Sequence, residues 1–213
     1  MTVFVDLDGP ILDVSERYYR VYADALEVLG AKAMDKQTYW DAKRRRVPDL
    51  EILKWSGAGE KLQRFQEERD RRIESDEYLV WDQLQDGSLE VLESLQLQHT
   101  LVLVTLRSRG LQLEKQLNDL GVRQLFKAVL SSGDDLKPRW KIKYRLILEY
   151  LDGKCPETAW MIGDTETDVL AGRELGFRTV AIINGIRSKE LLEQIRPDYL
   201  LGSVKSLPSV LMA

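Results

Sequence analysis

The sequence predicts an α/β fold with a Rossmann-like parallel sheet core and an inserted helical cap domain. Short apolar, β-prone runs alternate with helical patterns over most of the chain, which is typical of parallel α/β sheets. One long segment near the N-terminus breaks this alternation and is helical throughout. Of the 213 residues, 44% are apolar and 31% are charged, so a substantial buried core can coexist with a charged surface.

Six apolar runs are the expected strands. Each is short and most end at glycine or polar residues, as buried parallel strands do. Between them, apolar residues recur with a helical period, which predicts helices that cover the sheet. The expected strands are residues 2–5, 101–104, 128–130, 159–162, 179–183 and 199–201, and the expected helices are residues 111–120, 142–151 and 169–175.

The helical segment that interrupts this pattern is the expected cap. It begins with one apolar stripe at helical spacing, formed by Tyr18, Val21, Tyr22, Ala25, Leu26 and Leu29. We therefore expect residues 15–86 to form the cap, and residues 1–14 and 87–213 to form the α/β core.

Composition and charge exclude some classes of partner. The formal net charge of −4 gives no indication of binding to nucleic acid or to an anionic membrane. Cys155 is the single cysteine, so no internal disulfide can form, and a reducing compartment is the simplest setting. The chain starts without a basic and then apolar leader pattern, so we expect a cytoplasmic location. The sequence does not determine the oligomeric state.

The candidate site residues follow three of the predicted strands. Asp6 and Asp8 follow the first strand, Thr105 follows the second, and Asp164 follows the fourth. In an open parallel sheet, ligands bind beyond the carboxyl ends of the strands, so these side chains are expected to converge there.

The first strand runs into Asp6-Leu7-Asp8-Gly9, which places two carboxylates close together. Such carboxylates repel each other unless a proton or a cation intervenes. Mg²⁺ prefers oxygen ligands of this kind, and Gly9 permits a sharp turn after the strand. The alternative is an acidic turn that only closes the strand.

A second acidic pair follows the fourth predicted strand. Asp164 and Asp168 are four residues apart and would share one face of a helix that starts here. Acidic residues at a helix start are also ordinary capping residues, so capping alone is the alternative.

These motifs together resemble the haloacid dehalogenase-like hydrolase superfamily, in particular its phosphoglycolate phosphatase-like members. Asp6-Leu7-Asp8-Gly9 with Asp13 resembles the first motif, Thr105 the second, and Gly163-Asp164 with Asp168 the fourth. The stretch 171–176 and Asn184-Gly185 are similar to those members too. The interval between Asp13 and Thr105 leaves room for the helical cap that such members carry.

The resemblance implies a Mg²⁺-dependent phosphomonoester hydrolase that acts on a small phosphorylated metabolite through an aspartyl phosphate. Asp6 would be the nucleophile and Asp8 the general acid and base. Thr105 and a lysine would bind the phosphoryl oxygens, with Gly9 and Leu106 as further substrate contacts. Mg²⁺ would be held by Asp6, by Asp8 through its backbone carbonyl, and by Asp164. Asp168 would either ligate through water or hold the lysine.

The sequence leaves two roles open: the lysine that binds the phosphoryl group and the cap residue that contacts the substrate. Lys137, Lys141 and Lys143 all precede or open the predicted helix 142–151; Lys137 is preferred because Lys137-Pro138 resembles the family's Lys-Pro pair, with Lys143 as the alternative. In the cap, Arg45 belongs to the dense basic run of residues 43–46 and is a candidate contact for a substrate anion, although a solvated helix face is the common outcome for such a run.

Three other functions are compatible with parts of this pattern. A phosphosugar mutase shares every motif and differs in its cap and in the lifetime of its phosphoenzyme. A metal-independent dehalogenase would leave the additional carboxylates without a purpose. A non-enzymatic, phosphate-binding regulatory protein on a similar sheet would explain neither the inserted segment nor the motif at 163–168.

Overall fold

The computed structural model describes residues 1–133 and 136–211, which divide into two compact units. The first unit comprises Met1–Asp13 and Leu84–Ala213, and the second comprises Val14–Gln83. The sequence predicted that the inserted segment runs over residues 15–86. Within the described ranges, no helix is long and apolar enough to cross a membrane.

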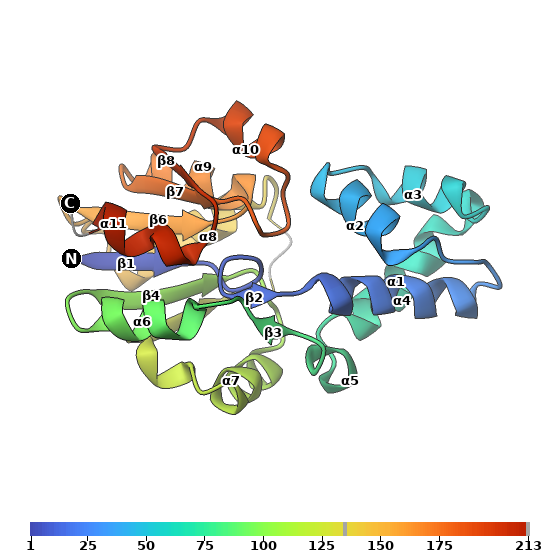
Figure 1. Cartoon of the computed structure of the whole chain (residues 1–213), viewed down its shortest axis with the longest axis horizontal. Coiled ribbons are helices and arrows are strands. Elements are labelled where there is room, and N and C mark those ends of the chain that lie inside the picture. Colours follow the sequence, from blue (N-terminus) through green and yellow to red (C-terminus); the bar gives the residue numbers. More distant parts are fainter. Residues whose placement is uncertain (134–135, 212–213) are drawn as a thin grey trace. The chain divides into compact units, whose positions relative to one another are not determined.

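The first unit is built on a six-stranded parallel sheet in the order β5-β4-β1-β6-β7-β8, which confirms the predicted fold class. The arrows of β1, β4 and β6 run the same way in Figure 1. Each of the six predicted strands is present, and the bounds differ from the prediction by a residue or less at either end. The strands are β1 (Thr2–Val5), β4 (Thr100–Thr105), β5 (Ala128–Ser131), β6 (Ala159–Gly163), β7 (Arg178–Ile182) and β8 (Tyr199–Leu201).

Helices cover both faces of this sheet. On one face lie α6 (Ser88–Gln96) and α11 (Leu207–Leu211), and on the other lie α8 (Trp140–Tyr150) and α9 (Glu166–Glu174). The remaining elements of the unit are α7 (Gly110–Asp119), α10 (Lys189–Ile195), η2 (Arg123–Leu125) and η3 (Val204–Ser206).

Alternation of side chains along the strands builds the core under α8 and α9. Phe4, Val102 and Met161 point to this face from three adjacent strands and are fully buried. Phe4 stacks on Phe177 with ring centroids 5.4 Å apart. β1 lies inside the sheet and is apolar on both faces, so its neighbouring strands and the packed side chains on either face hold it in place. Asp6, which follows β1, is therefore held in a defined position.

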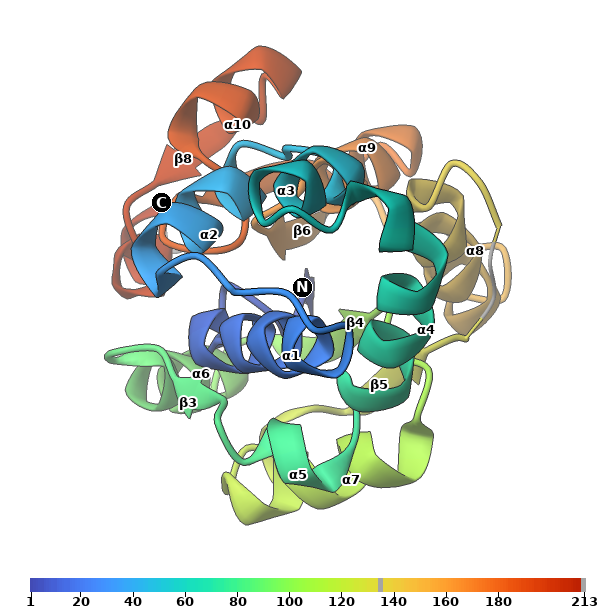
Figure 2. The ribbon, with the colours of Figure 1, turned by 90° about the vertical axis from the view of Figure 1, so that its right-hand side faces the viewer.

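The second unit is helical, with α1 at its centre. It contains α1 (Ser15–Val28), α2 (Lys36–Arg44), α3 (Asp49–Trp55), η1 (Gly59–Lys61), α4 (Leu62–Arg72) and α5 (Asp76–Leu79). Helix α1 contacts α2, α4 and α5, whose labels surround it in Figure 2. Its apolar stripe is buried except for Tyr18, which is half-buried, and Tyr22 stacks on Tyr39 at 4.2 Å between centroids.

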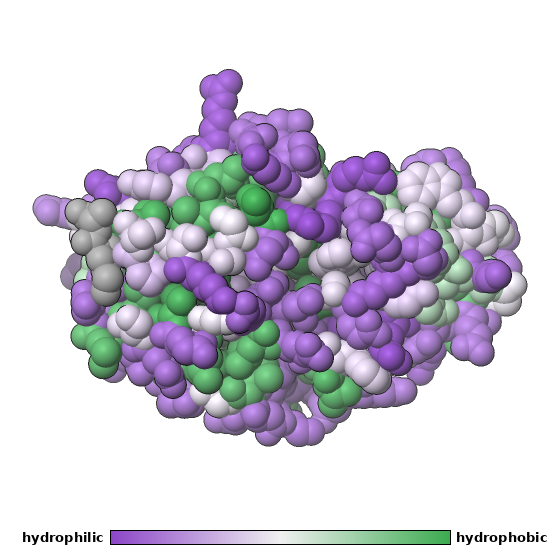
Figure 3. All heavy atoms as spheres, viewed as in Figure 1, coloured by the Kyte–Doolittle hydropathy of each residue, from purple (hydrophilic) through white to green (hydrophobic). Residues whose placement is uncertain are grey.

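Both passages of the chain between the units run through a two-stranded ribbon, β2 (Leu12–Asp13) and β3 (Gln83–Leu84). Close to it within the second unit, Arg17 on α1 forms an ion pair with Asp82, with 2.9 Å between Nε and Oδ1. Both side chains are 1% exposed or less, and Arg17 also donates to the carbonyl of Ile73 at 2.9 Å. Elsewhere the view in Figure 3 shows hydrophilic residues interspersed with apolar ones over the surface.

We predict that Asp82→Ala destabilises the protein by about 3 kcal/mol, because it removes a buried carboxylate that pairs with the guanidinium of Arg17. Urea unfolding followed by tryptophan fluorescence measures this change. Glu51→Ala is the matched control, since it removes an exposed ion pair with Lys54 and is expected to cost less than about 0.5 kcal/mol. Equal losses for the two variants would contradict the prediction.

Candidate active site

The order of the strands brings the predicted residues to one edge of the sheet. β1 lies between β4 and β6 and runs parallel to both. Asp6 continues from β1, and its backbone N–H donates to the carbonyl of Ile162 at 2.9 Å. Thr105 ends β4, and Asp164 follows β6 directly. The carboxyl ends of three neighbouring strands therefore carry the three side chains.

Asp6, Asp164 and Asp168 form a buried acidic cluster. One carboxylate oxygen of each lies within 4.8 Å of the other two. Oδ2 of Asp164 accepts a hydrogen bond from the backbone N–H of Ile186. Oδ1 of Asp164 is buried and has no hydrogen-bond partner among the described residues. Because buried carboxylate oxygens are normally satisfied, this oxygen points to a ligand.

Lys143 joins two of these carboxylates. Its Nζ lies 2.8 Å from Oδ1 of Asp6 and 2.5 Å from Oδ1 of Asp168, and the side chain is 1% exposed. The other oxygen of Asp168 accepts hydrogen bonds from the backbone N–H of Thr165 at 3.0 Å and from its hydroxyl at 2.8 Å. Asp168 thus takes part in the capping box of α9 and also contacts Lys143, so it does more than cap the helix.

Burial and like charge dominate the electrostatics of the cluster. Burial is the main cause that raises the pKa of Asp6 to about 7, against the opposing effect of Lys143. Burial and the charges of Asp6 and Asp168 also hold the pKa of Asp164 well above its usual range. For Lys143, burial alone lowers the pKa, but Asp168 and Asp6 outweigh it and raise that pKa above its ordinary value. A cation between the carboxylates would relieve the repulsion.

Two glycines allow the loops to close around Asp164. Gly9 has a φ of +106°, and a Cβ at this position would overlap the carboxylate of Asp164. A Cβ on Gly185, in the loop after β7, would overlap the same carboxylate. The backbone therefore approaches this oxygen cluster from two sides, at positions that exclude side chains.

The oxygen-only cluster fits a hard divalent cation. The unsatisfied oxygen of Asp164, the adjacent carboxylate of Asp6 and the close approach of the Gly9 loop make up such a site. Mg²⁺ prefers a few carboxylates and retains several waters, which matches this incomplete protein shell.

Asp8 has an environment of its own. Its carboxylate is 15% exposed and contacts the guanidinium of Arg107, with 2.5 Å between Nη2 and Oδ1. Nε of Arg107 donates to both oxygens, at 3.1 and 3.3 Å. The side chain of Asp8 is therefore no part of the acidic cluster. Sequence reasoning missed Arg107, although its position two residues after Thr105 could have placed it at this edge.

The structure separates the candidate lysines. Lys143 is buried among the carboxylates, whereas Lys137 and Lys141 are exposed. The preference for Lys137 rested on the Lys-Pro pair, but the chain from there to α8 leaves Lys137 on the surface. The contacts favour the alternative, Lys143.

The remaining sequence candidates are placed as follows. Thr105 is 2% exposed, its hydroxyl accepts from the N–H of Arg107 at 3.4 Å, and Leu106 beside it is half-buried. Arg45 is exposed at the end of α2 in the second unit, where its Nε donates to the carbonyl of Asp41 at 3.2 Å. It remains a predicted substrate contact.

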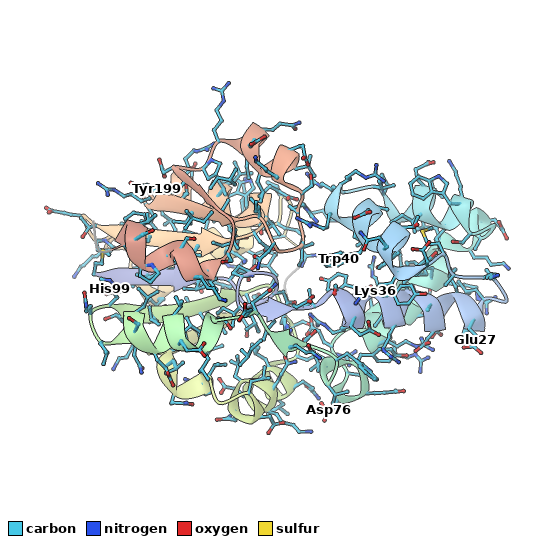
Figure 4. The ribbon with its side chains drawn as sticks, in the orientation of Figure 1. Glu27, Lys36, Trp40, Asp76, His99 and Tyr199 are labelled. Atoms are coloured by element: carbon cyan, nitrogen blue, oxygen red, sulfur yellow. The ribbon has the colours of Figure 1, made fainter. Side chains whose placement is uncertain are left out.

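His99 lies away from the site within the first unit, and Trp40 makes a packing contact within the second unit. Figure 4 labels His99, which precedes β4 and so lies at the opposite end of that strand from Thr105. Trp40 on α2 packs edge-on against Tyr18 at 6.0 Å between centroids, which is a packing contact.

Comparisons with known proteins agree with this geometry. The model of the haloacid dehalogenase-like hydrolase family matches residues 1–176. A pyrophosphatase PpaX of Bacillus mycoides is 38% identical over 64 residues, which are 30% of this chain and 29% of that protein. A pyrophosphatase PpaX of Halalkalibacterium halodurans is 24% identical over 97% of this chain and 94% of its own length. A haloacid dehalogenase-like hydrolase from Streptococcus pneumoniae has the same fold, with a TM-score of 0.81, 21% identity and coverage of 99% and 97%.

We predict that Asp164→Asn stabilises the metal-free protein, and more so as the pH rises from about 4 to 8. The folded-state pKa of Asp164 is raised, so folding favours its protonated form and stability is lost as the pH rises. Asparagine does not ionise and avoids this loss. Thermal unfolding at several pH values in chelator measures the effect.

Added Mg²⁺ should reverse the order of stability. At a hundredfold excess over its dissociation constant, Mg²⁺ should stabilise the parent protein by about 3 kcal/mol and the variant far less. Asp119→Asn, at an exposed position on α7, is the control that should change neither behaviour. An Asp164→Asn variant that Mg²⁺ still stabilises fully would contradict the assignment of this site.

Proposed function

Because the chain belongs to the haloacid dehalogenase-like hydrolase family, we propose that it is a Mg²⁺-dependent phosphomonoester hydrolase that works through an aspartyl phosphate. The observation that carries this proposal is the carboxylate of Asp6, which follows a central strand, contacts a lysine cation and belongs to the buried acidic cluster. The proposed substrate is a small phosphorylated metabolite. The cytoplasmic location expected from the sequence remains a prediction.

Asp6 is the proposed nucleophile. One of its oxygens forms a bond to phosphorus while the bond from phosphorus to the leaving oxygen breaks, which gives an aspartyl phosphate. The N–H of Leu7 donates to Oδ1 of Asp6 at 2.9 Å, and Lys143 contacts the same oxygen. These two donors fix the carboxylate, so the attack requires little reorganisation.

Lys143 and Thr105 are the proposed ligands of the phosphoryl oxygens. The ammonium group of Lys143 lies within hydrogen-bond distance of the nucleophile and therefore beside any phosphorus that Asp6 attacks. Its charge would offset charge on the phosphoryl group, and the hydroxyl of Thr105 would donate to another oxygen. Asp168 holds the lysine from its other side. Gly9 and Leu106 are proposed as further contacts of the substrate beside these residues.

Asp8 is the proposed general acid and base. It would donate a proton to the leaving oxygen and later accept one from the water that hydrolyses the aspartyl phosphate. Its position supports this role, since it lies two residues from the nucleophile and outside the acidic cluster.

Mg²⁺ would be held by Asp6, Asp164 and the backbone carbonyl of Asp8. When bound, it would reduce the repulsion between the anionic nucleophile and the anionic phosphoryl group. Asp168 is engaged with Lys143 and Thr165, so we assign it to positioning the lysine.

A phosphosugar mutase and a pyrophosphatase are the two alternative activities that a panel of substrates would test. A phosphosugar mutase would share the site, and it would isomerise a sugar phosphate instead of releasing inorganic phosphate. Two relatives are named pyrophosphatases, so inorganic pyrophosphate belongs in any substrate panel.

Arg45 is a proposed contact for an anionic leaving group, and its replacement should alter the ranking among substrates.

We predict that Asp6→Asn reduces phosphate release by more than about a thousandfold with the fold intact, because an amide is a very poor nucleophile. Release of inorganic phosphate from a panel of phosphorylated metabolites, pyrophosphate and an aryl phosphate is the measurement, with circular dichroism for folding. The parent enzyme should lose activity in chelator and regain it with Mg²⁺. Near-normal turnover of Asp6→Asn would exclude the covalent mechanism.

We further predict unequal effects at the three lysines. Lys143→Met should lower kcat/KM by more than about a hundredfold, because it removes the cation beside the phosphoryl group. Lys137→Met and Lys141→Met are matched exposed controls and should stay within about threefold of the parent. A severe loss at Lys137 with a mild one at Lys143 would reverse the assignment.

A further inference from the structure

A buried arginine occupies the site and has no part in the chemistry described so far. Arg107 follows β4 and is 4% exposed. Its Nε donates to both oxygens of the Asp8 carboxylate, and its Nη2 donates to Oδ1. A fork of this kind fixes the plane and the direction of a carboxylate, which a single donor does not.

Arg107 is itself held from the opposite side. Its Nη1 donates to Oε1 of Gln116, which is 8% exposed on α7. The Arg107 backbone N–H also donates to the hydroxyl of Thr105. Gln116, Arg107 and Asp8 thus form a chain of hydrogen bonds that runs from a packed helix to the loop after β1. Such a chain transmits the rigidity of the helix to a loop side chain.

We infer that Arg107 is a positioning residue for Asp8, and that Gln116 secures Arg107 in that role. The inference rests on the proposed function, in which Asp8 carries the proton to the leaving oxygen and from water. Proton transfer requires the carboxylate within hydrogen-bond reach of the leaving oxygen, and small displacements reduce its contribution. Asp8 lies beyond the end of β1, so the backbone ladder alone does not fix its side chain.

The competing explanation is that the ion pair only stabilises the fold. A structural role lowers all activities by a common factor, whatever residue stands at position 8 and whatever group leaves. A positioning role acts through Asp8, so it vanishes when Asp8 is replaced. It also depends on the leaving group, since an alkoxide needs a proton to depart whereas 4-nitrophenolate departs without one.

The experiment is a double-mutant cycle with Arg107→Ala, Asp8→Asn and the double variant. The measurement is kcat/KM for glycerol phosphate and for 4-nitrophenyl phosphate, at saturating Mg²⁺. We expect Arg107→Ala to lose about thirtyfold with the alkyl ester and less than about threefold with the aryl ester. In the Asp8→Asn background, the same substitution should change either value by less than about twofold.

Three further variants guard against a loss of folding. Arg107→Lys keeps the charge without the fork and should show an intermediate loss with the alkyl ester. Gln116→Ala leaves the pair with Asp8 in place and should show a smaller loss of the same kind. Arg123→Ala breaks an arginine–carboxylate pair outside the site, with Glu114 on α7, the helix that also carries Gln116. Its kcat/KM should stay within about twofold of the parent value. Thermal unfolding of each variant reports the fold.

The outcomes separate the inference from the proposed function. Equal losses from Arg107→Ala in both backgrounds, or equal losses with both esters, would overturn the positioning role. If Arg107→Ala does not fold, Gln116→Ala takes its place in the same comparison. A loss in kcat/KM that is equal for both esters, or no loss at all, would then overturn the positioning role. Parent-level activity of Asp8→Asn with the alkyl ester would overturn the role of Asp8 itself, which is a failure of the proposed function.

Discussion

The contact between Lys143 and the carboxylates of Asp6 and Asp168 is the interaction on which the rest of the site depends. Three buried carboxylates without a cation would repel one another, and burial would raise the free energy of each ionised form. The ammonium group offsets part of that cost at 2.8 and 2.5 Å. The remaining imbalance, seen in the raised pKa of Asp164, is what makes the cluster suited to a further cation.

The sheet makes this contact possible. β1 lies between β4 and β6, so the side chains that follow these strands meet at one edge without any long loop. Helix α8 crosses the face of the sheet that carries Phe4 and Met161, and its first turn brings Lys143 to the end of β1. The apolar packing of one face and the polar cluster at the edge are therefore parts of a single arrangement.

Two carboxylates on one short segment have different surroundings, which suits the different roles proposed for them. Asp6 lies among Lys143 and two further carboxylates, whereas Asp8 lies against Arg107 and is partly exposed. The proposed nucleophile and the proposed proton carrier need such different environments. The second unit adds a packed helical body with its own buried ion pair, and the proposed choice of substrate belongs to it.

The sequence by itself determined the fold class, the strands, the family resemblance and the acidic residues at the strand ends, because these depend on local periodicity and on short motifs. The fold class and the membership of the family are confirmed. Only the tertiary structure shows which candidate lysine contacts the acidic cluster, because the local Lys-Pro pair favoured Lys137, whereas the packing of α8 against the sheet places Lys143 there. The position of Arg107 at the sheet edge could be expected from Thr105, but its contacts could not, because its partners Asp8 and Gln116 come from a distant loop and from helix α7. Contacts between residues far apart in the chain depend on how the elements pack, and a local sequence motif does not specify that packing.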